Sequence, residues 1–586
     1  MCGITGVISD SNAPFKAFTG LKKLEYRGYD SWGIAFKSCD GIEIHKAVGR
    51  ISAPEKGTLN HNSYASIAHT RWATHGKVTV ENAHPHISND KSIAIVHNGI
   101  MENYQEVKQH LKEKGFTFYS ETDTEVLANL IQLKVAEKKS FMEGVRAALH
   151  EVEGSYAILA LHNNSYELVA AKNGSPLALG IGNNELFAAS DVAAFLPYTK
   201  TAVYLNDNEM ALLGNELKVF DIKTGKEIQY RKKQILWTVE QAEKGNYNHF
   251  MAKEIAEQPL TIKKSIEQEK GKVEKVAGLI KKAKGVFFVG CGTSYHSCIS
   301  SSYLFSNIAK MHVNVVLASE FRNYNEFLKP ETLVIAVSQS GETADVIDAI
   351  KTAKSKGSKV VAIVNVMDST IMRLSDEHLM MNAGPEICVL STKSYTSQLS
   401  ILSLLAYAVA GRLGEGRKLV EEAAKNAEET IKRNEPIAKE IAKKFSKARD
   451  FFLIGRDLAF PTALEGALKI KEVSYIHAEG FAGGELKHGT IALIEEGVPC
   501  IVLSTDETRP LIISNATEVK SRGGVIIGVD SKEDKIFDYF MKVDELGNAN
   551  PITMILPIQL LAYHLALERN CDPDKPRNLA KSVTVK

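Results

Sequence analysis

The hydrophobic pattern of the chain changes near residue 270. Up to about residue 240, short apolar runs are separated by Gly and Asn turns. They predict strands at CGITGVI, WGIAFKS, ASIAHTRWA, SIAIVHNGI, GSYAILALH, LFAASD and EMALLG. Helix-length segments interrupt these runs at 105–114, 124–137 and 141–150. The first part of the chain is therefore predicted to be an α+β domain with much β-sheet.

After residue 270, continuous apolar runs alternate with helix-length segments. GVFFVG, TLVIAVS and KVVAIVN are such runs, and they are typical of a parallel sheet covered on both faces. The pattern occurs twice, because GVFFVGCGTS at 285–294 is echoed by DFFLIGRDLA at 450–459, an offset of 165 residues between Gly290 and Gly455. We therefore expect two α/β domains of one type in tandem.

These patterns give a domain plan for the 586 residues, which are too many for one hydrophobic core. The last segment should be an extended end, either disordered or docked on the protein. The expected parts are an N-terminal domain at 2–240, a linker at 241–269, the first α/β domain at 270–415, a connecting helical segment at 416–448, the second α/β domain at 449–570 and a tail at 571–586.

Charge and cysteine content narrow the functional classes. The 71 Lys and Arg offset 70 Asp and Glu, so no overall field attracts nucleic acid or an anionic membrane. No signal peptide and no run of 18 apolar residues is evident, which predicts a cytoplasmic protein without a membrane span. Seven cysteines without a C-x-x-C pair argue against a disulfide framework and against a structural zinc site.

Cys2 is the first candidate for chemistry. An initiator methionine before so small a residue is normally removed, so Cys2 is expected to become the N-terminus. A thiol nucleophile needs a base, and an N-terminal cysteine carries one in its own α-amine, whose ordinary pKa is about 8. Taken alone, Cys2 is better explained as a small core residue at the start of a strand.

Polar clusters at the ends of the apolar runs supply the other parts that such a nucleophile needs. Asn98 and Gly99 could provide an amide and a backbone N–H for an oxyanion. Arg71 could hold a carboxylate and Asp123 an ammonium group, which together fit the head of glutamine. Each has a plainer reading: a surface ion pair for Arg71, a hairpin turn for Asn98-Gly99 and a helix cap for Asp123.

The segment SQSGET at 338–343 follows one strand and precedes a helix. Hydroxyl groups and a glycine at a helix N-terminus favour a phosphate site, and without a G-x-x-x-x-G-K-[ST] motif a sugar phosphate fits better than ATP. The alternative is an ordinary Ser/Thr helix cap. Thr293 and Ser294 end a neighbouring strand, so they should lie at the same edge of the sheet.

The second repeat has STDET where the first has SQSGET, and it is expected not to bind phosphate. Its chemistry lies instead in EGALKIKEVSYIHAEG and GGELKHG, which bring Lys469, Glu472, His477 and His488 close together in the sequence. Lys469 and Glu472 share a helix face. Without further context they could also form an exposed ion pair.

Taken together, these motifs resemble the glutamine–fructose-6-phosphate aminotransferase (isomerizing) family. The motifs are MCGI, YRGYDS, HTRWATHG, HNGI, SQSGETAD, STK, ELKHG and RNLAKSVTV, and the resemblance covers nearly the whole chain. It implies an α+β N-terminal-nucleophile (αββα) glutaminase domain followed by two α/β parallel-sheet sugar isomerase (SIS) domains. The glutaminase motifs alone would also suit amidophosphoribosyltransferase or a glutamate synthase, but the tandem SIS half does not.

The resemblance implies a role for each matching residue. In the glutaminase half, Cys2 is the nucleophile and Trp72 gates an ammonia channel. Asn98 and Gly99 form the oxyanion hole, and the glutamine-binding residues are Arg71, Thr74, His75 and Asp123.

In the SIS half, Glu472 moves a proton between C1 and C2 of the sugar, His488 of a neighbouring subunit opens the sugar ring, and Lys581 meets the C2 carbonyl. The phosphate-binding positions are Ser294, Ser338, Gln339, Ser340 and Thr343, and the residues that line the sugar are Thr293, Val389 and Ser391.

The implied substrates are L-glutamine and D-fructose 6-phosphate, with no metal and no other cofactor, in a homodimer that shares the sugar site between subunits. Free ammonia must stay unprotonated to attack a ketone, so an enclosed path between the two sites is expected.

Val78 and Trp32 depart from the family pattern beside the glutamine site, which puts loop packing in doubt.

Two rival functions remain. One is a deglycase-like or alternative-ketose SIS enzyme that kept a glutaminase domain. The other is a sugar-phosphate sensor, since SIS domains also serve as binding modules. A sensor needs neither the nucleophile Cys2 nor the proton shuttle Glu472, so these two residues favour an enzyme.

Overall fold

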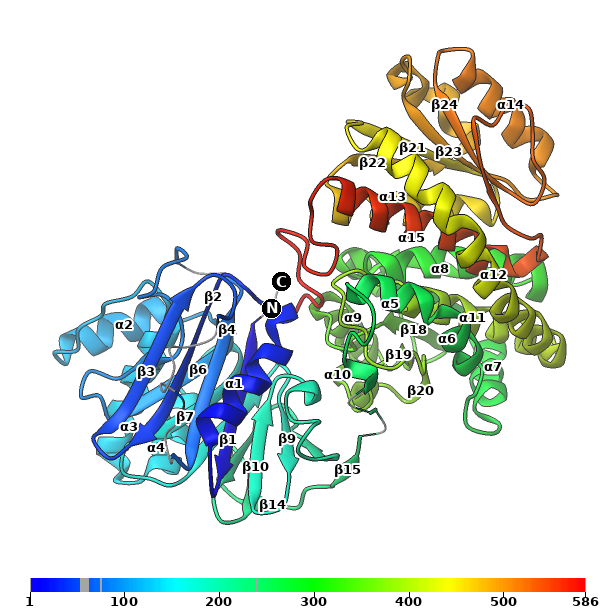
Figure 1. The fold of residues 1–586 in the computed structure, drawn as a ribbon. Helices are drawn as coiled ribbons and strands as arrows, with labels where there is room; N and C mark the ends of the chain where they lie inside the picture. Colours follow the sequence, from blue (N-terminus) through cyan, green and yellow to red (C-terminus); the bar gives the residue numbers. More distant parts are fainter. Residues whose placement is uncertain are drawn as a thin grey trace. The chain divides into compact units, whose positions relative to one another are not determined.

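The computed structural model describes residues 2–52, 59, 63–73, 76–235, 237–238 and 240–584. The chain divides into two compact units (Figure 1). Unit 1 contains residues up to Ala242 together with those from Ala580 onward, and unit 2 is Glu243–Leu579.

Unit 1 is built on two antiparallel sheets. The first has eight strands, in the order β15 (Lys233–Gln234), β11 (Thr201–Tyr204), β9 (Ala178–Ile181), β10 (Glu185–Ala189), β1 (Gly3–Ser9), β4 (Ala65–Arg71), β2 (Ser31–Ser38) and β3 (Gly41–Val48). The second has seven, in the order β14 (Glu227–Ile228), β13 (Leu217–Asp221), β12 (Glu209–Leu213), β8 (Leu168–Asn173), β7 (Gly154–His162), β6 (Ile93–Met101) and β5 (His86–Ile87).

Helices cover the outer faces of the two sheets. α1 (Ala13–Lys23) packs on the eight-stranded sheet, while α3 (Asp123–Lys138) packs on the seven-stranded sheet together with α2 (Tyr104–Glu113) and α4 (Phe141–Leu149). Small and branched side chains from both sheets, such as Ile67 and Leu159, fill the space between the sheets. The result is the predicted αββα sandwich.

The first half of unit 2 has a five-stranded parallel sheet. Its order is β17 (Asn314–Leu317), β16 (Gly285–Gly290), β18 (Thr332–Ser338), β19 (Lys359–Val364) and β20 (Glu377–Met380). Alternate residues of β16 belong to two different cores, Phe288 to one and Phe287 to the other, so both faces of this sheet are buried. The helices of this half are α7 (Lys272–Lys282), α8 (Thr293–Leu304), α9 (Ala344–Ser355), α10 (Thr370–Leu374) and α11 (Lys393–Val409).

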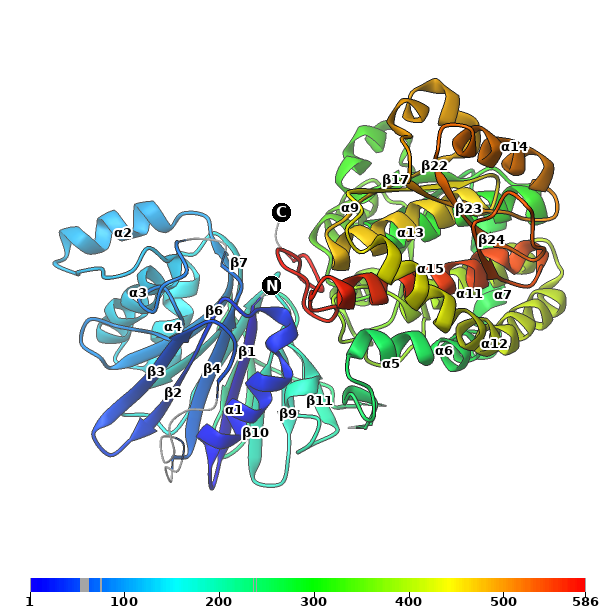
Figure 2. The same ribbon diagram turned by 45° about the horizontal axis from the view of Figure 1, so that its top comes forward.

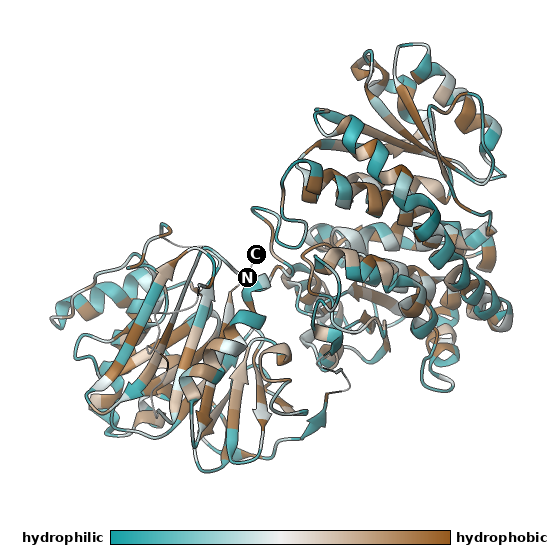
Figure 3. Cartoon of the chain, in the orientation of Figure 1, coloured by the Kyte–Doolittle hydropathy of each residue, from teal (hydrophilic) through white to brown (hydrophobic). Residues whose placement is uncertain are grey.

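The second half repeats this architecture. Its parallel sheet has the order β22 (His477–Ala482), β21 (Asp450–Gly455), β23 (Pro499–Leu503), β24 (Val525–Asp530) and β25 (Tyr539–Lys542). The strands are strongly hydrophobic (Figure 3), as expected for strands buried on both faces. α13 (Ala459–Ser474) and α15 (Asn550–Glu568) pack side by side (Figure 2), and α14 (Arg509–Lys520) follows β23.

The predicted connecting segment at 416–448 is part of one long helix, α12 (Leu413–Phe445). Its buried residues, such as Val420, Ala427 and Ile441, recur every three or four positions, so one stripe of the helix faces the core. The residues predicted as a linker at 241–269 contain two helices, α5 (Phe250–Ala256) and α6 (Gln258–Ser265), whose apolar side chains join the core of unit 2.

One helix among the described residues, Gly547–Glu568, is long and apolar enough to cross a membrane. Within unit 2, 94% of the most apolar 18-residue stretch of this helix is buried. Helix α15, which makes up most of Gly547–Glu568, packs against α12 and α13. This is the environment of a core helix in a folded domain.

Candidate active sites

Cys2 lies immediately before β1, with its thiol against the end of β4. The backbone N–H of Trp72 donates a hydrogen bond to Cys2 Sγ at 3.1 Å. The Asn98 side-chain amide donates to the carbonyl oxygen of Cys2 at 3.0 Å. Burial raises the pKa of the Cys2 thiol, so an adjacent base is needed to make it a nucleophile.

Asn98 and Gly99 do not form a hairpin turn. Both lie inside β6, where they pair with Ala157 and Tyr156 of β7. Gly99 has φ +133°, and a Cβ atom there would lie 2.0 Å from the carbonyl oxygen of Ser155. The unusual backbone at Gly99 breaks the regular strand geometry close to the thiol, as expected where a backbone N–H turns toward a ligand.

Arg71 is the last residue of β4 and is only 3% exposed, so the surface ion-pair reading is wrong. Its guanidinium group donates hydrogen bonds to the carbonyl oxygens of Lys77 at 3.1 Å and Gly76 at 3.3 Å. These two contacts hold the fork of the side chain in one orientation, which suits bidentate recognition of a carboxylate.

Asp123 is the first residue of α3, and Thr122 occupies the cap position instead. The carboxylate of Asp123 accepts a hydrogen bond at 2.9 Å from the backbone N–H of Met101, two residues beyond Gly99. Asp123 is therefore tied to the strand that carries Asn98 and Gly99.

The loop after Trp72 is described only in part, and the predicted glutamine-binding residues Thr74 and His75 lie outside the described residues. The Trp72 ring packs edge-on against Tyr29, with 5.6 Å between centroids. Trp32 packs against Phe18 of α1 at 5.6 Å, and Val78 is 43% exposed. Trp32 thus packs between α1 and its sheet, whereas Val78 lies largely at the surface.

Four buried histidines lie beside this site, a feature that the sequence analysis did not single out. His69 and His84 stack with 4.1 Å between centroids, and His84 lies 4.8 Å from His86. His84 and His97 both approach the Thr124 hydroxyl, at 2.8 and 3.0 Å. Burial is the main cause that lowers the pKa of all four, so the cluster is neutral at pH 7. The HPH and HNG sequences on neighbouring strands were the available signal.

The SQSGET segment forms the turn between β18 and α9. The Ser338 hydroxyl lies 3.0 Å from that of Thr343 and accepts a hydrogen bond from the backbone N–H of Gly341 at 3.1 Å. Gly341 has φ +67°, and a Cβ atom there would lie 2.0 Å from Ser369 Oγ. Hydroxyl groups and N–H groups therefore converge at the N-terminus of a 12-residue helix, which is a suitable arrangement for a phosphate.

Thr293 and Ser294 begin α8 directly after β16, and β16 pairs in parallel with β18. Their position at the same edge of the sheet as Ser338 is as predicted. Ser294 Oγ accepts a hydrogen bond at 3.0 Å from the side-chain amide of Gln398 in α11. A phosphate cradle and its neighbouring strand end are thus held by packed helices.

Lys469 connects the two SIS halves. Its ammonium group donates to Thr293 Oγ1 at 3.0 Å and to the carbonyl oxygen of Ser391 at 3.2 Å. It also pairs with Glu465 at 3.2 Å and with Glu472 at 2.9 Å. Burial alone would lower the pKa of Lys469, but the two carboxylates outweigh it and raise the pKa above its usual value.

The shared helix face of Lys469 and Glu472 is confirmed, and the exposed ion-pair reading is wrong, because the Lys469 side chain is fully buried. Glu465, also fully buried, was missed by the sequence analysis. It accepts hydrogen bonds from Thr293 at 3.0 Å and pairs with His296 at 2.8 Å. Its place four residues before Lys469 was the signal that could have revealed it.

The remaining predicted residues are more dispersed. His488 is exposed in the 3₁₀ turn Gly483–His488, and Lys581 belongs to the final segment grouped with unit 1. His477 lies at the amino end of β22, where it pairs with Asp450 at 2.8 Å. Its ion-pair partner is Asp450 rather than Lys469 or Glu472, so His477 is not part of the Lys469–Glu472 network.

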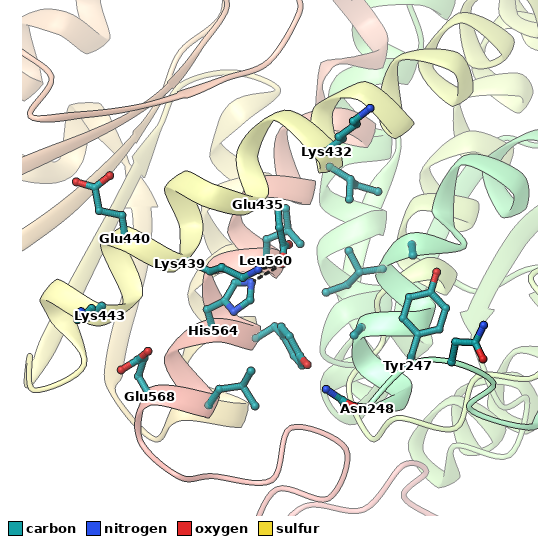
Figure 4. A pocket seen from close by; sticks show the side chains of 17 residues that line it. Tyr247, Asn248, Lys432, Glu435, Lys439, Glu440, Lys443, Leu560, His564 and Glu568 are labelled. Atoms are coloured by element: carbon teal, nitrogen blue, oxygen red, sulfur yellow. Dashed lines mark hydrogen bonds and ion pairs between the residues drawn. The ribbon is translucent and has the colours of Figure 1, made fainter.

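Unit 2 also contains a cavity of about 850 Å³ between α5, α12 and α15 (Figure 4). Its apolar wall includes Ile255 and Leu560, and Glu435 on α12 accepts a hydrogen bond from His564 at 2.9 Å. None of the predicted site residues lines this cavity. Within the part of the chain that the structure describes, no group of three or more His, Cys, Asp and Glu side chains could hold a metal ion.

Two protein families match the chain. The SIS domain family matches residues 279–408 and 444–569, and the glutamine amidotransferase domain family matches residues 69–197. These matches agree with the sandwich of unit 1 and with the two parallel sheets of unit 2. The predicted fold class is confirmed.

Full-length relatives and solved structures agree with this assignment. Enzymes named glutamine–fructose-6-phosphate aminotransferase (isomerizing) from Thermococcus kodakarensis and Pyrococcus horikoshii are 45% and 46% identical, with 100% of each chain covered. The C-terminal domain of glucosamine-fructose-6-phosphate aminotransferase from Francisella tularensis matches with a TM-score of 0.53 and 33% identity, over 57% of this chain and 99% of that one. Tagatose-6-phosphate ketose/aldose isomerase from Escherichia coli, at 15% identity and a TM-score of 0.51 over 57% of this chain and 96% of that one, shares the fold alone. The chain belongs to the glutamine–fructose-6-phosphate aminotransferase (isomerizing) family.

Proposed function

We propose that the protein transfers the amide nitrogen of L-glutamine to D-fructose 6-phosphate and isomerises the product, giving D-glucosamine 6-phosphate and L-glutamate. This reaction is the first step of amino-sugar synthesis. The observation that carries the proposal is the presence of two different sites on one chain. A thiol site lies in unit 1, and a phosphate cradle beside a buried Lys469–Glu472 pair lies in unit 2.

In the glutaminase site, Cys2 attacks the carboxamide carbon of glutamine. Its α-amine, free once Met1 is removed, takes the thiol proton and later delivers it to the leaving ammonia. Asn98 and Gly99 stabilise the oxyanion, and the buried Arg71 and Asp123 hold the carboxylate and ammonium groups of glutamine. Water then releases glutamate from the thioester. Thr74 and His75 complete the glutamine site, and Trp72 gates the path of ammonia.

In the sugar site, the phosphate binds the turn between β18 and α9 and the start of α8. Five residues provide its hydroxyl, amide and N–H groups: Ser294, Ser338, Gln339, Ser340 and Thr343. Thr293, Val389 and Ser391 line the sugar. His488 of a second copy of the chain opens the ring, and Lys581 meets the C2 carbonyl.

Ammonia adds to C2 of the open-chain ketose and water leaves, which forms a C2 imine. Glu472 removes a proton from C1 and a proton is returned to C2. The C1 hydroxyl loses its proton and the imine nitrogen gains one, so the imine becomes an amine and C1 becomes an aldehyde. Lys469 holds the Glu472 carboxylate at 2.9 Å and also donates to the carbonyl oxygen of Ser391, so it ties the base to the loop that lines the sugar. The chemistry needs no other cofactor.

The proposed role of His488 requires a homodimer with a sugar site shared between subunits. We place the enzyme in the cytoplasm, because the seven cysteines form no disulfide bond within the described part of the chain, as expected in a reducing compartment. The domain plan follows the family: glutaminase residues 2–240, SIS domains near 270–415 and 449–570, and a tail from 571 that closes the sugar site.

Glutamine labelled with ¹⁵N at the amide and fructose 6-phosphate test the proposal directly. We expect glucosamine 6-phosphate that carries the heavy isotope, and one glutamate for each amino sugar. Glutamate without any amino sugar would favour a deglycase-like or alternative-ketose enzyme. Binding of the sugar phosphate with no turnover of either substrate would favour a sensor.

A further inference from the structure

The chain leaves α15 through a short turn that we call the tail root, residues 572–577. It contains no helix or strand, and in Figure 1 it is part of the red loop that follows α15. The Asp572 carboxylate accepts hydrogen bonds from the backbone N–H groups of Asp574 at 3.0 Å and Lys575 at 3.2 Å. The tail root is therefore a defined turn, and its neighbours determine where the rest of the tail begins.

The first anchor is the side chain of Asp574, which is 8% exposed. Its two carboxylate oxygens accept hydrogen bonds, each at 2.8 Å, from the backbone N–H groups of Phe250 and Met251 at the start of α5. Burial raises the pKa of Asp574, and these two N–H groups oppose that effect. A buried carboxylate with both oxygens bound to backbone has one position available.

The same turn holds the loop that carries two predicted sugar-site residues, Val389 and Ser391. The carbonyl oxygen of Asp574 accepts a hydrogen bond from Val389 N–H at 3.1 Å. From α5, Glu254 accepts hydrogen bonds from the N–H groups of Ile387 at 2.6 Å and Cys388 at 3.1 Å. Helix α5, the tail root and the loop 387–391 thus form a closed triangle of contacts.

The second anchor is on the other SIS half. Arg577 N–H donates to the Tyr475 hydroxyl at 2.7 Å, and its guanidinium group lies 4.2 Å from the centre of the Tyr475 ring. Tyr475 follows the end of α13, the helix of Glu472, and has φ +58°. A tyrosine in this left-handed conformation is strained, and the surrounding contacts must offset that strain.

We propose that Asp574 and Tyr475 are positioning residues for the sugar reaction. Between them they fix the tail root to both SIS halves, so that the loop 387–391 and the helix of Glu472 keep their spacing. The inference rests on the proposed function. Ser391 and Glu472 meet through Lys469, so a displaced loop also disturbs the base.

Removing the Asp574 or the Tyr475 contact should slow product formation more than it weakens sugar-phosphate binding. The phosphate cradle is the turn between β18 and α9, which is not part of the tail root. Asp574→Ala and Tyr475→Phe are expected to lower kcat for synthesis about tenfold or more, as small misplacements of reacting groups do. The KM for fructose 6-phosphate should stay within about threefold, and more than one glutamate should be released for each amino sugar. Asp574→Asn, which keeps one acceptor oxygen, should fall between wild type and Asp574→Ala.

Matched controls are Asp40→Ala, at an exposed position between β2 and β3, and Tyr166→Phe, whose side chain is 73% exposed. Both should leave the glutamate-to-amino-sugar ratio at one. Far-UV circular dichroism identifies the variants that fold. If Asp574→Ala does not fold, the kcat and product ratio of Tyr475→Phe and Asp574→Asn test the proposal. A folded set of variants with wild-type kcat and a ratio of one would overturn the proposal, even if the melting temperature fell. Wild-type protein that makes no glucosamine 6-phosphate would instead overturn the proposed function.

Discussion

Glu472 is the residue on which the proposed sugar chemistry most depends. Glu472→Gln keeps the size of the side chain but removes the base, so synthesis should fall by at least about 10²-fold. Glutamine hydrolysis should survive because Cys2 belongs to unit 1. Fructose 6-phosphate should still bind, because the cradle around Ser338 uses hydroxyl and N–H groups.

Calorimetry of sugar-phosphate binding, with glutamate and amino-sugar assays on the same preparation, checks this prediction. Glu495→Gln, at an exposed position of the same SIS half, is the control. Synthesis by Glu472→Gln at a rate near that of wild type would return Glu472 to the role of an ion-pair partner.

Lys469 has a structural role that can be measured separately. Lys469→Met would leave the buried carboxylate of Glu465 without its cation, and this kind of loss typically costs about 3–5 kcal/mol of unfolding free energy. Lys471→Met, at an exposed position of the same helix, should change it by no more than about 0.5 kcal/mol. Urea unfolding followed by far-UV circular dichroism compares the two. Equal stabilities for these variants would contradict the buried network.

At the scale of elements, the turn between β18 and α9 depends on the backbone of Gly341. Gly341→Ala places a methyl group on Ser369 and also requires φ +67° of an alanine. We expect the KM for fructose 6-phosphate to rise by about tenfold or more, because the N–H groups that face the phosphate must move. Gly411→Ala is the matched control, since Gly411 has φ +77° but no neighbouring atom within 4 Å. Similar KM values for the two variants would show that the turn tolerates the shift.

At the scale of the whole molecule, the two units should respond differently to acid. The pKa values of His69, His84, His86 and His97 are all lowered, and His69 falls to about 3. The unfolded chain therefore binds more protons than unit 1 does below about pH 6.5, the ordinary pKa of histidine. The stability of unit 1 is complete above that pH and decreases as the pH falls toward 3, by about 1.4 kcal/mol per pH unit for each neutral buried histidine.

Tryptophan fluorescence can follow unit 1 alone, because all three tryptophans, Trp32, Trp72 and Trp237, precede residue 243. His86→Gln should reduce the slope of unfolding free energy against pH by about 1.4 kcal/mol per pH unit. His150→Gln, at an exposed position, should leave it unchanged. A pH-independent stability between pH 6.5 and 5 would contradict a neutral cluster.

The sequence by itself determined the elements and their order. Short apolar runs between Gly and Asn turns marked β1, β2, β4, β6 and β7, and continuous apolar runs that alternate with helix-length segments marked β16, β18, β19 and β21. The internal repeat and the SQSGET turn could also be identified from the sequence. Each copy of the repeat, like the turn, is recognised from a pattern within one short segment of the chain.

Only the tertiary structure decided which distant residues meet. Arg71 and Lys469 each allowed a surface reading until their burial was known, since local sequence does not reveal what covers a side chain. The contacts of Lys469 with Thr293 and Ser391 and the contacts of Asp574 with α5 join residues that are 78 to 324 positions apart in the chain. The histidine cluster lies closer together in the chain, between His69 and His97, but it too forms only when separate segments pack together. Asn98-Gly99 shows the opposite limit: its local preference is a turn, but pairing with β7 holds it in a strand. Propensity is a local free energy of order 1 kcal/mol, and long-range packing and sheet pairing exceed it.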